Sequence, residues 1–196
     1  QYLAFLKKLF AIGGKPGSAV AMNSKRLPLD QEHLEFLNLL IAVCMKKMKI
    51  DETCDEDSID EIDEFNETIR SKLKVFQDSI AIINPSIYMD NMSKHIETLM
   101  ASTDWRDLEL ATYQMHNFAE SVRNNLFGLN KNEITNSQPH IFMSKCMATL
   151  LSSTVLFQIN NPLIQISFFE LVVRHYSFLD STNKDEVTLQ WADRKS

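Results

Sequence analysis

Histidines and cysteines, the residues that most often hold metals or act as nucleophiles, are widely separated in this sequence. The histidines are His33, His95, His116, His140 and His175, and the cysteines are Cys44, Cys54 and Cys146. No H-E-x-x-H motif and no C-x-x-C pair occurs among them, so we expect surface or partly buried helix residues rather than zinc ligands. An odd number of cysteines argues against a disulfide framework and favours a reducing compartment. We therefore expect no metal, no cofactor and no catalytic residue.

Two short segments resemble enzyme motifs without meeting their requirements. Residues 13–18 read Gly-Gly-Lys-Pro-Gly-Ser, but the phosphate-loop pattern G-x-x-x-x-G-K-[ST] is not matched, and the proline removes a backbone donor. Residues 152–154 read Ser-Ser-Thr and lack the G-x-S-x-G context of a hydrolase nucleophile. We interpret the first as a surface loop and the second as small residues that allow close helix packing. An enzyme is therefore the least favoured class of function.

The strongest charge feature is an acidic loop at residues 51–64, which contains nine carboxylates. Carboxylates interact favourably with a helix N-terminus, so one interpretation is a solvated loop that leads into a first helical turn. The alternative is a docking strip for a basic protein partner, centred on Asp55, Glu56 and Asp57. The spacing does not match a calcium-binding loop, which needs glycine at its sixth position and glutamate at its twelfth.

Arg70 and Lys74 are the candidate nucleic-acid contacts. They stand four residues apart on one flank of a predicted helix, where both could meet phosphate oxygens. Glu67 lies on the same flank, and we favour an ion pair between Glu67 and Arg70 over a phosphate contact. The net charge of −6 argues against the broad basic surface of a typical nucleic-acid binder, although it leaves room for one basic face.

The elements that must position these residues are almost all helices. Apolar residues recur at three- and four-residue steps, and no stretch alternates polar and apolar residues for long enough to predict a strand. One stripe, in a helix over residues 58–83, consists of Ile62, Phe65, Ile69, Leu73, Phe76, Ile80 and Ile83. Other helices are expected over residues 2–12, 30–49, 85 onward, 105–125, 139 onward, 162–179 and near 184. The expected N-caps are Asp30, Asn84, Asp104 and Asn161.

The spacing of these helices indicates an all-α helical-repeat fold. Helix pairs of about 40 to 50 residues are typical of HEAT and armadillo arrays. We expect a HEAT-type superhelix of about three to four antiparallel helix pairs over residues 1–196, with the acidic loop and a polar loop at residues 130–138. Apolar residues cover most of the circumference of the 162–179 helix, which therefore needs neighbours on several sides, as in a solenoid. The alternative is a single globular helical bundle. No apolar run reaches the roughly 18 residues of a membrane span.

Three segments have more distinctive amino-acid sequences. Residues 65–74 read Phe-Asn-Glu-Thr-Ile-Arg-Ser-Lys-Leu-Lys, and residues 105–111 read Trp-Arg-Asp-Leu-Glu-Leu-Ala. Residues 168–176 read Phe-Phe-Glu-Leu-Val-Val-Arg-His-Tyr. Together they resemble the exportin-T family of importin-β-like karyopherins, most closely its fungal members. The last segment is similar to the family's F-F-E-x-V-V-R-Y signature, with His175 in place of the final tyrosine. Weaker similarity extends from about residue 34 to residue 179, so the chain resembles a central segment of a longer receptor.

This resemblance implies a superhelix that encloses mature tRNA together with GTP-bound Ran in the nucleus. The complex would pass nuclear pores by contacting nuclear pore proteins and would release tRNA in the cytoplasm. It also implies a monomeric receptor without membrane contact or catalytic residues, which recognises RNA through backbone shape and phosphates. Because this segment is acidic, we expect it to supply curvature and contacts to Ran more than affinity for tRNA. The rival interpretation is a HEAT-repeat scaffold or transport receptor for protein cargo, with no role in RNA binding.

Overall fold

A computed structural model of the chain describes residues 3–4, 29–54, 58–153, 159 and 161–179. All regular elements within these residues are helical, which confirms the all-α prediction. None of the helices in this described part is long and apolar enough to cross a membrane. The predicted glycine loop at residues 13–18, nearly all of the predicted helix at residues 2–12 and the predicted helix near residue 184 lie outside the described residues.

The helices follow the predicted order along the chain. They are α2 (Gln31–Lys47), α3 (Ile59–Phe65), the π-helical turn η1 (Asn66–Arg70), α4 (Ser71–Ile83), α5 (Pro85–Met100), α6 (Trp105–Arg123), the 3-10 helix η2 (Lys131–Asn136), α7 (Gln138–Ser152), α9 (Pro162–His175) and the 3-10 helix η3 (Tyr176–Phe178). α3, η1 and α4 form one continuous helix, which matches the helix predicted at residues 58–83. The polar loop predicted at residues 130–138 is mostly occupied by η2.

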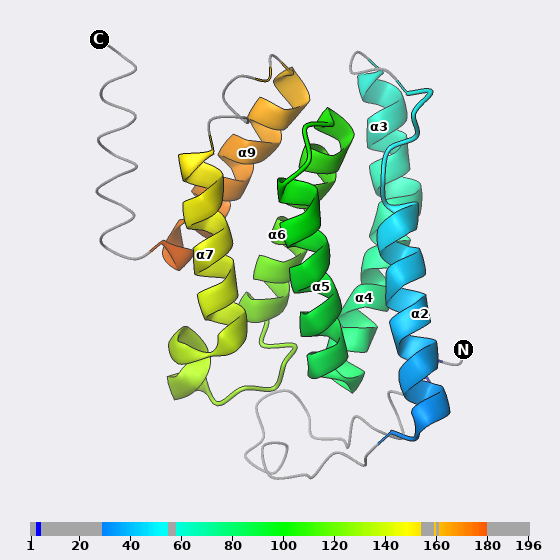
Figure 1. The fold of residues 1–196 in the computed structure, drawn as a ribbon, viewed down its shortest axis with the longest axis vertical. Helices are drawn as coiled ribbons and strands as arrows, with labels where there is room; N and C mark the ends of the chain where they lie inside the picture. The colour runs from blue at the N-terminus through cyan, green and yellow to red at the C-terminus, as the bar shows by residue number, and fades with distance from the viewer. Residues whose placement is uncertain (1–2, 5–28, 55–57, 154–158, 160, 180–196) are drawn as a thin grey trace.

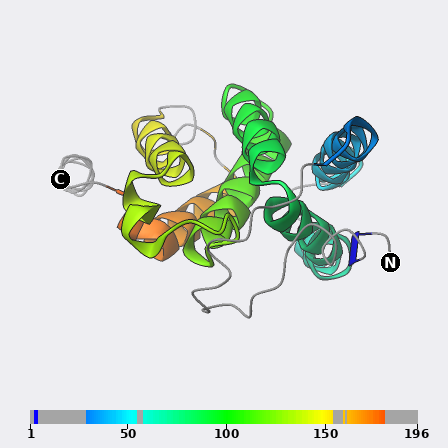
Figure 2. The ribbon, with the colours of Figure 1, turned by 90° about the horizontal axis from the view of Figure 1, so that it is seen from below.

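The helices form two layers (Figures 1 and 2). Seen from below in Figure 2, α2, α5 and α7 lie in one row, and α4, α6 and α9 lie in the other. Neighbours within a layer pack on each other, as α2 does on α5 and α6 does on α9, and hairpins such as α5–α6 join the layers. Each successive hairpin thus stacks beside the previous one, as in a HEAT-type superhelix. This arrangement confirms the helical-repeat prediction.

Side-chain caps begin the helices where the sequence predicted. The four predicted caps accept a backbone N–H of the first helical turn at 2.9 to 3.1 Å, and they are Asp30, Asn84, Asp104 and Asn161. Each cap satisfies a donor that has no partner within its own helix. Pro85 and Pro162 follow their caps directly, at a position where the missing N–H costs little.

The hydrophobic core lies between the two layers and is rich in aromatic rings. Tyr88 of α5 stacks on Phe118 of α6 with ring centroids 6.0 Å apart, and Phe118 meets Phe142 of α7 edge to face at 5.4 Å. Such pairs stabilise the fold beyond the burial of their area. The same cluster includes Leu37 of α2 and Phe168 of α9, so one core joins all the hairpins.

The prediction of one apolar stripe over residues 62–83 that faces the core is wrong for the middle of the helix. Ile69 and Phe76 are 43% and 40% exposed, whereas the polar Arg70 and Gln77 are fully buried. The cause is η1, in which a backbone hydrogen bond spans five residues instead of four. Because a π turn contains more residues than an α turn, it rotates the residues that follow around the helix axis. The rotation brings Arg70 to the inner side, where the sequence pattern had placed Ile69.

Candidate functional site

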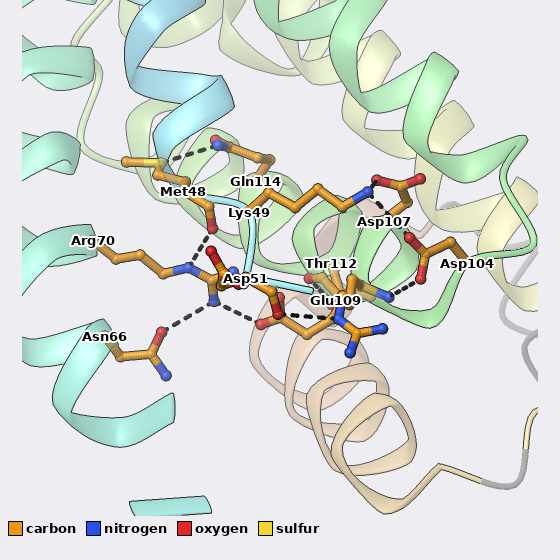
Figure 3. Close-up of polar contacts among 11 residues, drawn as sticks. Met48, Lys49, Asp51, Asn66, Arg70, Asp104, Asp107, Glu109, Thr112 and Gln114 are labelled. Atoms are coloured by element: carbon orange, nitrogen blue, oxygen red, sulfur yellow. Dashed lines mark hydrogen bonds and ion pairs between the residues drawn. The ribbon is translucent and has the colours of Figure 1, made fainter. Parts of the chain in front are cut away.

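Arg70, one of the two predicted phosphate contacts, lies in the interior and points from η1 toward α6 (Figure 3). Its Nη1 and Nη2 atoms donate to Oε1 and Oε2 of Glu109, each at 2.7 Å. Two parallel bonds of this kind use the planar fork of the guanidinium and are stronger than neutral hydrogen bonds. Glu109 is also buried, so the pair is a salt bridge shielded from water.

Two further N–H donors of the Arg70 guanidinium are also engaged, and two aromatic rings lie against it. Nε donates to the carbonyl of Met48 at 2.8 Å, just after α2, and Nη1 donates to Asn66 Oδ1 at 3.0 Å. The aromatic ring of Tyr113 lies 4.4 Å from the guanidinium carbon, and that of Phe65 lies 5.2 Å away. Such cation–π contacts add attraction when they are desolvated. Arg70 therefore ties the end of α2, the η1 turn and α6 together.

These contacts correct two predictions for Arg70. The expected ion pair with Glu67 does not form, because Glu67 is exposed while the arginine side chain turns inward to Glu109. A guanidinium that is fully buried and held by a carboxylate, a carbonyl and an amide cannot reach an RNA phosphate at the surface, so Arg70 is wrong as a phosphate contact. Sequence reasoning missed Glu109 because it lies 39 residues away on another helix.

Lys74, the second predicted phosphate contact, remains near the surface. Its side chain is 30% exposed, and its Nζ lies 2.7 Å from Oδ2 of Asp78, one helical turn further along α4. A partly exposed pair at this spacing contributes only about 0.3 to 0.5 kcal/mol. A phosphate could therefore replace Asp78 at modest cost, and Lys74 as a phosphate contact stays a prediction.

Asp55, Glu56 and Asp57, the predicted partner contacts, lie outside the described residues, but the segment that precedes them is well anchored. Arg106 of α6 donates to the backbone carbonyls of Cys54 at 2.7 Å and Glu52 at 3.1 Å. The start of the acidic loop, up to Cys54, therefore lies against the N-terminal end of α6. This anchorage depends on a residue more than 50 positions further along the chain.

A second set of contacts fixes the chain just before the acidic loop. Lys49 bridges Asp107 at 2.6 Å and Asp104 at 3.1 Å, as Figure 3 shows. The backbone N–H and hydroxyl of Thr53 donate to Asp51 and hold the pKa of that carboxyl below its usual value. The first carboxylate of the loop is therefore charged at neutral pH.

A groove of about 440 Å³ opens between the end of α2 and α3, next to the acidic loop. Its charged lining residues are Lys46, Lys47, Lys49, Asp51 and Glu61. Because charges of both signs line it, this groove suits a polar protein surface better than a polyanion.

The structure brings together two histidines that the sequence had left apart. His116 of α6 and His175 at the end of α9 lie with Nδ1 and Nε2 3.0 Å apart, although 59 residues separate them. Burial lowers the pKa of both rings, that of His175 to about 4, so both are neutral at pH 7. The expectation that every histidine would be a surface or partly buried residue is wrong for His175, which is fully buried.

Comparison with known proteins identifies the relatives of this chain. A family model described as Exportin-T matches residues 19–188. The Exportin-T proteins of Eremothecium gossypii and Vanderwaltozyma polyspora are 64% and 62% identical to it over 96% of its length, and that of Saccharomyces cerevisiae is 38% identical over 100%. The chain spans only 17 to 18% of the length of these relatives. The chain therefore belongs to the Exportin-T family.

Proposed function

We propose that this chain is a central helical-repeat segment of a nuclear export receptor for tRNA. The receptor binds mature tRNA cooperatively with GTP-bound Ran and carries it through nuclear pores by contacting nuclear pore proteins. The receptor is a monomer that works only by binding its partners and has no catalytic residues. It moves between the nucleus and the cytoplasm. The observation that carries this proposal is the 64% identity to an Exportin-T over nearly the whole chain.

The two-layer fold supports this proposal physically. A stack of hairpins presents one continuous concave surface, which can follow the backbone of a folded RNA without reading its bases. The buried Arg70–Glu109 salt bridge helps to fix the angle between the α2–α4 hairpin and the α5–α6 hairpin. We therefore assign Arg70 to the shape of the receptor and Lys74 to a single phosphate contact.

The acidic loop is the part of this segment that we assign to a protein partner. The stretch that directly precedes Asp55, Glu56 and Asp57 is a fixed base, because Arg106 holds its backbone against α6. A cluster of carboxylates on such a base attracts a basic surface and accelerates its association. We propose that GTP-bound Ran supplies that surface.

A receptor for protein cargo without a role in RNA binding is the second candidate. Two observations favour it: the net charge of the segment is −6, and Arg70, one of the two predicted phosphate contacts, is held in a buried salt bridge. Under this alternative the acidic loop and the mixed-charge groove beside it would receive cargo.

Binding of tRNA to the full-length protein, with and without GTP-loaded Ran and across a salt series, separates the two candidates. An export receptor binds tRNA more tightly when GTP-loaded Ran is present, and its affinity falls as salt rises because phosphate contacts release counterions. GDP-loaded Ran is the matched control, since it differs only in the nucleotide. Absence of tRNA binding under every condition would reject the RNA role and leave the protein-cargo receptor.

A further inference from the structure

A cluster of three potential metal ligands lies where α6 packs on α9. His116 and Glu120 stand one turn apart on the same face of α6, and His175 comes from the end of α9. Their ligand atoms all lie within 4.8 Å of one another. Two imidazoles and one carboxylate are a donor set that zinc accepts, with a water molecule in the fourth position.

The spacing of the two imidazoles is close to what zinc requires. The two ring nitrogens that face each other are 3.0 Å apart. Two nitrogens at zinc bond lengths of 2.0 to 2.1 Å and a tetrahedral angle lie about 3.3 Å apart. The separation of the two nitrogens therefore differs from that of a zinc-bound pair by only a few tenths of an ångström. The helices that carry the histidines are held together by the common core and need not move.

A surface groove gives a cation access to the cluster. In the hydrogen-bonded pair one of the two facing nitrogens carries a proton, so that ring must change to its other tautomer before both nitrogens can bind a metal. His116 also lines a surface groove of about 230 Å³ together with Thr112, Tyr113 and Arg174, which provides an entry path. Glu120 is held only loosely, since its carboxylate lies 3.6 Å from the largely exposed Arg123.

We propose that His116, Glu120 and His175 bind one zinc ion, with water as the fourth ligand. The ion would connect α6 to the end of α9 and so fix the angle between two successive hairpins. The site is independent of the tRNA and Ran interactions, and its test needs neither partner.

The test measures zinc binding to the full-length protein after treatment with a chelator, by competition with a chromophoric indicator. His116→Gln should remove one high-affinity equivalent of zinc, or weaken it by at least about tenfold, because even the loss of a ligand's supporting partner costs roughly 10- to 100-fold. His33→Gln is the matched control, since His33 on α2 belongs to no such cluster within the described residues. Cobalt in place of zinc should give the strong visible absorption of a tetrahedral site, and His116→Gln should abolish it.

Two further variants keep the proposal open to refutation even if one substitution disturbs the fold. His175→Tyr keeps an aromatic ring at this buried position and should still lose the same equivalent of zinc. Arg123→Gln removes the competitor for Glu120 and should tighten zinc binding. Unchanged stoichiometry and affinity in both His116→Gln and His175→Tyr, with circular dichroism showing native helix content, would overturn the proposal and leave a hydrogen-bonded histidine pair.

Discussion

Arg70 and Glu109 form two parallel hydrogen bonds of 2.7 Å in the interior of the protein, between η1 and α6. Both partners lie in segments that resemble the family's motifs, at residues 65–74 and 105–111. Those two motifs are therefore in contact through their charged residues. The π turn that brings Arg70 inward is part of the same arrangement, since without it the arginine would lie on the outer side of its helix.

Removing one partner of this salt bridge should strongly destabilise the α2–α4 and α5–α6 hairpins. Arg70→Met leaves the Glu109 carboxylate buried without a partner, which typically costs about 3 to 5 kcal/mol. Amide hydrogen exchange of the full-length protein should show faster exchange in α4 and α6 and little change in α7. Arg70→Lys should also destabilise, because an ammonium cannot form the two parallel bonds.

The double variant Arg70→Met/Glu109→Leu is the control for this interpretation. Replacing both charges with apolar groups of similar size removes the unpaired charge, so much of the lost protection in α4 and α6 should return. If the double variant exchanges as fast as Arg70→Met alone, the contacts of Arg70 with Met48 and Tyr113 matter more than its charge pair.

Most of the helices could be predicted because their signals are local in the sequence. The buried pairs of the candidate site could not, because they depend on contacts between distant helices. The caps at Asn84 and Asn161 act within their own first turns, so sequence alone identifies them. The inward turn of Arg70 depends on Glu109, and the pairing of His116 with His175 depends on how α6 packs on α9. No spacing within a single helix encodes either contact. The apolar pattern even favoured the wrong face near Ile69, because a π turn leaves no compositional signature.

Lys74→Gln should weaken tRNA binding by the full-length receptor. Loss of one phosphate contact should also reduce the slope of log affinity against log salt by roughly 0.7 to 0.9. The effect should be the same for different tRNA sequences, because a phosphate contact carries no base specificity. Lys94→Gln makes the same charge change on an exposed position of α5, in the other layer, and should leave both affinity and slope unchanged. An equal loss in both variants would show that net charge, and not Lys74, is responsible.

Neutralising the acidic loop should slow association with GTP-bound Ran. The triple variant Asp55→Asn, Glu56→Gln and Asp57→Asn removes carboxylates that would steer a basic surface, so we expect the association rate to fall on the order of tenfold at low salt. Stopped-flow or surface-based kinetics at two salt concentrations would measure it. The dissociation rate should change little, since charges at the rim of an interface act mainly on encounter.

A matched triple variant distinguishes this loop from a general charge effect. Asp63→Asn, Glu64→Gln and Glu67→Gln removes three exposed carboxylates from α3 and η1, which follow the proposed docking residues Asp55, Glu56 and Asp57 in the chain. If association with Ran slows equally in both triple variants, the acidic loop is a solvated segment without a docking role.

Asp104 should contribute stability that disappears in acid. Its partial burial raises the pKa, but hydrogen bonds from the backbone of Arg106 and from Lys49 outweigh this effect and leave the pKa below its usual value. A carboxyl whose pKa is lower in the folded state stabilises the protein above its unfolded pKa of about 3.9 and loses that contribution as the pH falls through the folded value. Asp104→Asn keeps a side chain that caps α6 but loses the charge. At pH 7 we expect this variant to be less stable by up to about 1 kcal/mol, since the side chain is partly exposed.

The pH dependence distinguishes the stability that the charge of Asp104 contributes from the stability that its capping of α6 contributes. Urea unfolding at pH 7 should show the Asp104→Asn variant with a lower midpoint than the unmodified protein, and the two midpoints should converge as the pH falls below the folded pKa of Asp104. Asp90→Asn, at an exposed position of α5 that caps no helix, should match the unmodified protein at both pH values. If the difference between the two urea midpoints persists in acid, the asparagine fails as a cap. Once the carboxyl of Asp104 is protonated, the two proteins carry the same charge at this position, so charge cannot explain the difference.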